Sequence, residues 1–230
     1  MTDYATQLLL PVATAIRPAL NRVVFIGVES CGDYFRVDAD RVRGASLRHL
    51  AATTLATVSL DRIGAELVAS GLYRDLRGTD EEEWVTSTGF RIVICGAPAD
   101  TADPIESMIR EYAVLLTRTL ALTPDVSVRV SAPATLFALW WLRHAKRRTS
   151  MSECPLIEDI IELVARHPAL TDEIEAVPAE LRTFIATAAG GFLADDSAEW
   201  VIARALTDAR LTPSVVRPVV SAFRRIAGYP

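Results

Sequence analysis

The feature that most constrains this chain is the point at which β-strand patterns stop. Short runs of β-branched and aromatic residues occur only in the first 130 of its 230 residues. The strand candidates are Val23–Val28, Glu83–Thr86, Phe90–Cys95 and Val126–Val130. From residue 131 on, the apolar residues recur at helical spacing. The sequence therefore predicts an α+β fold, with a small mixed β-sheet flanked by helices in residues 1–130 and an all-helical C-terminal region in residues 131–230.

Turn and cap residues predict where several of these strands and helices begin and end. Ser87-Thr88-Gly89 separates two of the strand candidates and predicts a hairpin. Asp103-Pro104 is typical of a helix start. The N-terminal helix, residues 4–20, is expected to break or bend near Pro11 and Pro18. Five further helices are expected after residue 150, over 157–165, 171–176, 178–193, 198–208 and 213–226.

Composition narrows the class of protein. Half of the residues are hydrophobic and 23% are charged, which excludes a disordered chain. The net charge is −5, carried by residues 151–230, and this argues against binding nucleic acid through overall charge. Cys31, Cys95 and Cys154 lie far apart without metal-type spacing, so we expect buried thiols in a reducing compartment.

Nothing in the sequence predicts a membrane segment. Residues 1–4 lack the basic start of a signal peptide, and the apolar runs fall short of the ~20 residues that a membrane-spanning helix needs. We therefore expect a cytoplasmic protein. The oligomeric state is not predicted.

Three separated blocks resemble the AbiEii-like nucleotidyltransferases of type IV toxin–antitoxin (abortive-infection) systems. Residues 20–27 are similar to the opening strand and glycine turn of that family. Residues 65–75 resemble its next helix, followed by a tryptophan-containing hairpin from Trp84 to Cys95 and by Pro98. Residues 130–133, 157–164 and 180–185 resemble later helical segments.

This resemblance implies a defined chemistry. Members of the fold transfer a nucleotide from a nucleoside triphosphate (NTP), and some of the toxins modify tRNA. Carboxylates on adjacent strands hold Mg²⁺, which stabilises the charge that develops on the transferring group. A turn of two small residues lets backbone N–H groups approach the triphosphate. Gly27 matches the first of these two residues and is the candidate cofactor-binding position, but Val28 takes the place of the second.

The carboxylates that the resemblance requires are replaced. The Asp-x-Asp pair of the family falls near Arg48 and Leu50, and the strand expected to carry the third acid, residues 91–95, has none. The lysine and glutamate of the helix after Pro133 correspond to Leu139 and Trp141. A further aspartate corresponds to Leu156. These replacements favour a catalytically degenerate protein, a pseudoenzyme without a metal site or cofactor.

One alternative stays open. Asp38 and Asp40 follow the glycine turn at a spacing that other nucleotidyltransferases use for their acidic pair, and on a strand both carboxylates would face one side. The chain would then be an active, divergent enzyme that uses Mg²⁺ and NTP to modify tRNA or another RNA. Their neighbours Gly32-Asp33 and Arg43-Gly44 indicate a solvated loop instead.

The most basic stretch follows two tryptophans, Trp140 and Trp141. Arg143, Lys146, Arg147 and Arg148 are the candidate RNA-binding residues, and an adjacent aromatic ring could stack on bases. Cations also favour a helix C-terminus, and tryptophan is usually part of a core. The sequence therefore predicts a catalytically degenerate, cytoplasmic nucleotidyltransferase-fold protein that binds a protein or RNA partner.

Overall fold

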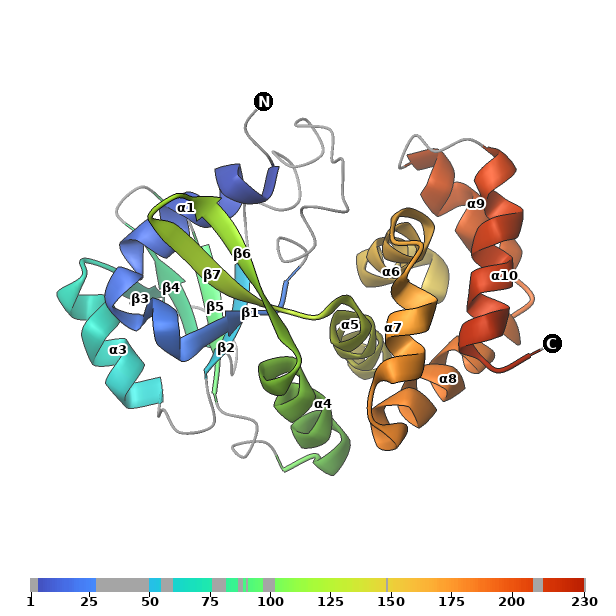
Figure 1. Ribbon diagram of the computed structural model, residues 1–230, viewed down its shortest axis with the longest axis horizontal. Coiled ribbons are helices and arrows are strands. Elements are labelled where there is room, and N and C mark those ends of the chain that lie inside the picture. Colours follow the sequence, from blue (N-terminus) through green and yellow to red (C-terminus); the bar gives the residue numbers. More distant parts are fainter. Residues whose placement is uncertain are drawn as a thin grey trace. The chain divides into compact units, whose positions relative to one another are not determined.

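The computed structural model of the 230-residue chain describes residues 4–27, 50–54, 60–75, 82–86, 89, 91–96, 102–147, 149–208 and 213–229. The chain divides into two compact units, Met1–Ala132 and Pro133–Pro230. The first unit contains the sheet and the second contains only helices in its described residues (Figure 1). This arrangement confirms the predicted α+β fold class with a mixed sheet, flanking helices and a helical C-terminal region.

The sheet has seven strands in the order β3-β4-β5-β2-β1-β7-β6. Their bounds are Val23–Phe25 (β1), Leu50–Thr54 (β2), Tyr73–Asp75 (β3), Glu82–Val85 (β4), Arg91–Cys95 (β5), Thr117–Thr123 (β6) and Val126–Ser131 (β7). Two of the pairs, β2 with β5 and β1 with β7, are parallel, and the others are antiparallel. The mixture of directions matches the prediction, and the antiparallel β4–β5 pair confirms the expected hairpin.

Three of these strands were not among the strand candidates in the sequence. β3 has three residues, and β2 carries the unremarkable pattern Leu-Ala-Ala-Thr-Thr. β6 pairs along its length with β7 at the edge of the sheet, and only Leu122 of its seven side chains is buried. Because an edge strand buries little apolar area, its sequence carries a weak signal. The strand predicted over 23–28 ends at Phe25.

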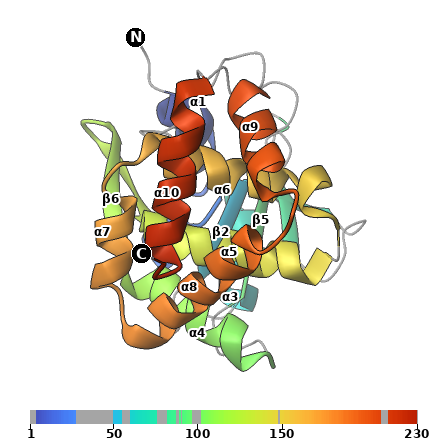
Figure 2. The same ribbon diagram turned by 90° about the vertical axis from the view of Figure 1, so that its right-hand side faces the viewer.

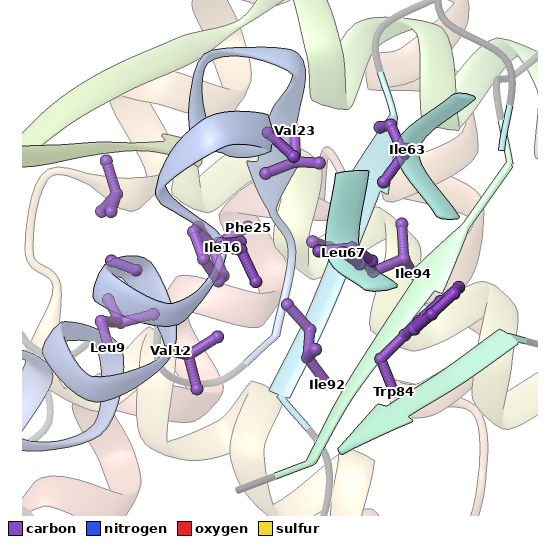
Figure 3. Close-up of a cluster of buried hydrophobic side chains, with 14 of the residues drawn as sticks. Leu9, Val12, Ile16, Val23, Phe25, Ile63, Leu67, Trp84, Ile92 and Ile94 are labelled. Atoms are coloured by element: carbon purple, nitrogen blue, oxygen red, sulfur yellow. The ribbon is translucent and has the colours of Figure 1, made fainter. Parts of the chain in front are cut away.

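One face of the sheet holds the core of the first unit. Apolar side chains of β1, β5 and β4 pack there against the helices α1 (Tyr4–Ala15) and α3 (Leu60–Ala69), as Figure 3 shows. Phe25, Ile63 and Ile92 are completely buried in this cluster. The remaining helix of the unit, α4, spans Pro104–Leu115, and Asp103 caps it as predicted.

The N-terminal helix corrects one expectation. α1 continues through Pro11 and ends at Ala15, and a 3-10 helix follows over Arg17–Arg22. Proline removes one backbone hydrogen bond from a helix. The buried side chains on both sides of Pro11, Leu9 and Val12, provide packing that offsets this loss. Pro18 lies in the first turn of the 3-10 helix, where a missing N–H costs little.

The second unit is a bundle of helices. It contains α5 (Pro133–Arg147), α6 (Pro155–Arg166), α7 (Leu170–Ala176), α8 (Ala179–Leu193), α9 (Ala198–Asp208) and α10 (Val216–Ile226), with short 3-10 helices at Met151–Glu153 and Pro213–Val215. Its centre is aromatic: Phe137 stacks on Trp141, and Phe192 meets Trp141 edge-on and also contacts Phe223. No helix in the described part of the chain is long and apolar enough to cross a membrane.

The last helix ends in a Schellman motif. Gly228 has a φ of 76°, and the N–H of Gly228 donates to the carbonyl of Arg225. The N–H of Tyr229 donates to the carbonyl of Arg224. This hydrogen-bond pattern fixes the direction in which the chain leaves the helix. It places Tyr229 against α8, where its hydroxyl lies 3.1 Å from the position a Cβ would take at Gly190.

Candidate functional site

The centre of the sheet is the place at which the resemblance predicts a nucleotide site. Gly27 lies two residues after β1, in a bend, and is buried. β1 is antiparallel to β2, with Val24 opposite Thr53. β2 is parallel to β5, with Thr53 opposite Cys95. The strand aligned with the family's acidic pair and the strand expected to carry its third acid are therefore direct neighbours.

Side-chain alternation separates two faces at this centre. Phe25, Ala52 and Ile94 point into the core beneath α1 and α3. Their neighbours along the strands, Val24, Thr53 and Cys95, occupy the opposite face. Val24 and Thr53 are completely buried and Cys95 is 3% exposed. The Thr53 hydroxyl donates to the Gly96 carbonyl at 3.2 Å.

The row Val24, Thr53 and Cys95 on this opposite face carries no charged side chain. Mg²⁺ prefers charged and carbonyl oxygens, and the three side chains in the row offer a methyl pair, one hydroxyl that already donates, and a thiol. A described carboxylate on the same face is that of Glu83 on β4, opposite Val93. It forms an ion pair with Arg91 at 2.5 Å. Among the described residues, no group of three His, Cys, Asp or Glu side chains could hold a metal ion.

The alternative acidic pair is not placed by the structure. Asp38 and Asp40 lie outside the described residues, as do Val28 and Arg48. Leu50 is the first residue of β2. The other positions that the resemblance aligns with catalytic residues are described: Leu139 and Trp141 are buried in α5, and Leu156 is half-buried in the first turn of α6.

The basic stretch forms the last turn of α5. Lys146 and Arg147 are exposed and Arg143 is half-buried, while Arg148 lies outside the described residues. Positions 143, 146 and 147 are spaced i, i+3 and i+4, so they share one stripe of the helix. Their cations also favour the negative end of the helix dipole.

The two tryptophans before this stretch do not face solvent. Trp140 is 1% exposed and Trp141 is 8% exposed, and Trp141 contacts Phe137 and Phe192 within the helical unit. They are therefore core residues, and stacking on bases is not open to them. His144 is also buried, and this burial lowers its pKa. The positive charge at the end of α5 thus comes from the arginines and the lysine.

Sequence reasoning did not anticipate the Glu83–Arg91 pair. The strand candidate Glu83–Thr86 places Glu83 in a strand, and Glu83 is the second residue of β4, but its partner Arg91 was not predicted. The signal was present in the hairpin register: a carboxylate and a guanidinium on neighbouring strands and the same face attract each other.

Two solved structures are similar to this one. The first is a crystal structure of an antigenic nucleotidyltransferase-like protein from Paracoccidioides brasiliensis, at 14% identity and a TM-score of 0.49, covering 91% of this chain and 92% of that one. The second is a crystal structure of JHP933 from Helicobacter pylori, at 9% identity and a TM-score of 0.46, covering 97% of this chain and 92% of that one. No protein-family model matches the sequence. A search of curated proteins finds no match either.

Proposed function

We propose that this chain is a catalytically degenerate nucleotidyltransferase-fold protein, related to type IV toxin–antitoxin toxins, that acts by binding a protein or RNA partner. Three blocks of sequence resemblance support the relationship. The arrangement of β1, β2 and β5 supports it independently, because the strands that the resemblance assigns to the metal-binding acids are adjacent. Three carboxylates can bind the same two metal ions only if the strands that carry them lie side by side.

The observation that supports the loss of chemistry is the absence of acids at Leu50 and along residues 91–95, together with the uncharged row Val24, Thr53 and Cys95 on β1, β2 and β5. These side chains lie on adjacent strands, opposite the core face, and are buried and uncharged. A two-metal transfer reaction needs several carboxylates that bridge the ions and hold the triphosphate in line. A neutral row in this place favours a protein that keeps the scaffold for recognition.

The candidate partner surface for RNA is the stripe formed by Arg143, Lys146 and Arg147. Arginine and lysine neutralise phosphates without reading sequence. Because the nearby tryptophans are buried, we expect backbone contacts rather than base stacking. Binding should therefore depend strongly on salt and weakly on RNA sequence.

The first experiment measures catalysis. Purified protein is incubated with tRNA, Mg²⁺ and each labelled NTP, beside the Asp38→Ala/Asp40→Ala double variant. We expect no incorporation above the background of the double variant. Transfer by the wild type that is abolished in the double variant would establish the active, divergent enzyme. Transfer by both would place the acids elsewhere and would equally overturn the proposal.

The second experiment measures RNA binding by fluorescence anisotropy with tRNA between 50 and 200 mM salt, roughly the range over which phosphate contacts dominate. Lys146→Gln/Arg147→Gln should weaken binding and lower the salt slope by about one per lost phosphate contact. Arg217→Gln/Arg224→Gln, on exposed positions of α10, removes the same charge elsewhere and is the matched control. Equal affinity of both pairs would exclude the α5 stripe and leave a protein as the partner.

A further inference from the structure

A groove of about 770 Å³ opens on the helical unit, and none of the candidate site residues described above lines it. It is formed by α7, α8 and the end of α10, which lie side by side in Figure 2. Its volume falls within the roughly 300–1,000 Å³ typical of small-molecule sites. The floor comes from small residues of α8, namely Ala186, Gly190, Gly191 and Ala194. Because these residues have little or no side chain, a ligand can approach the helix backbone closely.

Two adjacent glycines in the floor have different explanations. A Cβ at Gly190 would lie 3.1 Å from the Tyr229 hydroxyl, so packing within the chain explains this glycine. A Cβ at Gly191 would meet nothing within 4 Å. Glycine inside a helix costs roughly 0.5–1 kcal/mol relative to alanine. No contact in the described residues accounts for this cost at Gly191. A ligand bound in the groove would account for it, because the ligand would occupy the space next to the helix backbone.

An unpartnered hydroxyl also lines the groove. Thr171 is 5% exposed, and no hydrogen bond of its side chain is found among the described residues. A ligand atom that accepts or donates a hydrogen bond in the groove would satisfy Thr171.

Charged side chains stand on the wall of the groove. The groove is lined by two guanidinium groups, of Arg182 and Arg225, and by one carboxylate, of Glu175. Arg225 forms ion pairs with Asp172 at 2.9 Å and with Glu175 at 3.8 Å, and Arg182 donates one hydrogen bond to the Glu175 carbonyl. Each guanidinium has five N–H donors, so donors remain for an anion. Tyr229 adds an aromatic ring that is half exposed.

We propose that this groove binds a flat apolar anion no larger than a nucleoside monophosphate. The planar body lies on the smooth floor at Gly191 beside Tyr229, the anionic group is held by Arg182 and Arg225, and a polar atom contacts Thr171. A phosphate and a carboxylate would satisfy the arginines equally well. The site does not involve the central sheet or the α5 stripe, so it stands or falls independently of the proposed function.

The test uses the fluorescent anion 1-anilinonaphthalene-8-sulfonate with the full-length protein. We expect one site per chain, with affinity lowered at least tenfold in Gly191→Leu and in Thr187→Phe. Both fill the groove from exposed positions of α8, so one serves if the other fails to fold. Ala179→Leu, exposed on the same helix outside the groove, is the matched control. Circular dichroism verifies folding. Unchanged affinity in both blocking variants would overturn the proposal.

Specificity is tested with two further measurements. The double variant Arg182→Gln/Arg225→Gln should lower the affinity for the anionic probe about tenfold or more, the usual effect of losing charged hydrogen bonds. The affinity for the uncharged probe N-phenyl-1-naphthylamine should not change. An equal loss for both probes would contradict anion recognition. Displacement by AMP would identify a phosphate ligand, and displacement only by 2-naphthoate would identify a carboxylate. If neither competitor displaces the probe at millimolar concentration, the ligand class is wrong.

Discussion

Replacement of Gly191 by alanine should stabilise the protein. Gly191 lies in the interior of α8, is exposed, and has nothing within 4 Å of the position that a Cβ would occupy. The alanine therefore adds no steric cost. It removes the conformational entropy that glycine loses on folding, which is worth about 0.5–1 kcal/mol in an exposed helix interior.

Gly190→Ala is the matched comparison, one residue away in the same helix. Its helix-propensity gain is the same, but the new Cβ would lie 3.1 Å from the Tyr229 hydroxyl, closer than ordinary van der Waals contact. The next atom of the ring, Cζ, is 3.8 Å away, an ordinary contact. We therefore expect little or no net gain from Gly190→Ala alone. In the Tyr229→Phe background, which lacks the hydroxyl, Gly190→Ala should recover most of the gain.

Urea denaturation followed by circular dichroism measures these effects. With an m-value of about 1 kcal/mol/M, the Gly191→Ala midpoint should rise by about 0.5–1 M. The four proteins of the Gly190/Tyr229 set form a double-mutant cycle whose coupling energy isolates the contact. No rise for Gly191→Ala would refute the interpretation of this glycine as unconstrained by its neighbours. Equal rises for both single alanine variants would refute the steric role of Tyr229.

Three further predictions rest on single contacts. Asp103→Ala removes the cap that accepts from the N–H groups of Ile105 and Glu106 at 3.0 and 3.3 Å, and should cost about 1 kcal/mol of unfolding free energy, whereas Asp103→Asn should retain most of it. Ile92→Ala opens the core of the first unit at a completely buried position, and should cost roughly 2–5 kcal/mol in the same urea assay; a loss below 1 kcal/mol would contradict the described packing. Burial lowers the pKa of His144 below 6.5, so the unfolded chain binds this proton more tightly than the folded protein does, and the stability should fall as the pH drops below about 6.5. In thermal melts, His144→Gln should make the melting temperature depend less on pH in this range. The same pH dependence in the variant and the wild type would contradict this prediction.

The helical half was predictable because its signals are local. In α9 the predicted bounds, 198–208, coincide with the structure, and α8 differs by one residue at its start. Here the spacing of the apolar residues acts within a few turns of the same helix. Gly228, which ends α10, acts through its own positive φ, although its consequence for Tyr229 depends on α8 and cannot be read from the sequence.

The sheet was less predictable because strand pairing is not local. β2 lies between β1 and β5, although residues 26–49 and 55–90 separate them along the chain. The short residues Ala51, Ala52 and Thr53 have no strong strand pattern of their own. Their conformation follows from pairing on both sides, which a scan of local sequence does not contain. The resemblance anticipated a strand in this region, where residue patterns did not.

The same difference applies to the candidate sites. The proposed replacement of catalytic acids rests on the sequence resemblance, since it depends only on which residue stands at each aligned position. Burial of Trp140 and Trp141 could not, because aromatic residues beside arginines occur both in cores and on RNA-binding surfaces. The groove at Gly191 was also missed, although a Gly-Gly pair inside a predicted helix is itself a signal that something approaches the backbone.

The neutral row at the centre of the sheet has a consequence for folding as well as for chemistry. A carboxylate at a position as buried as Thr53 would require desolvation of a charge, which is unfavourable unless a cation or a hydrogen-bond donor compensates. Adjacent carboxylates would also repel each other across β2 and β5. With Val24, Thr53 and Cys95 in these places, the described part of the sheet needs no metal ion to offset such charges. Thr53→Asp should therefore destabilise the protein in the presence of chelator, and added Mg²⁺ should not restore it, because one carboxylate alone does not make a metal site.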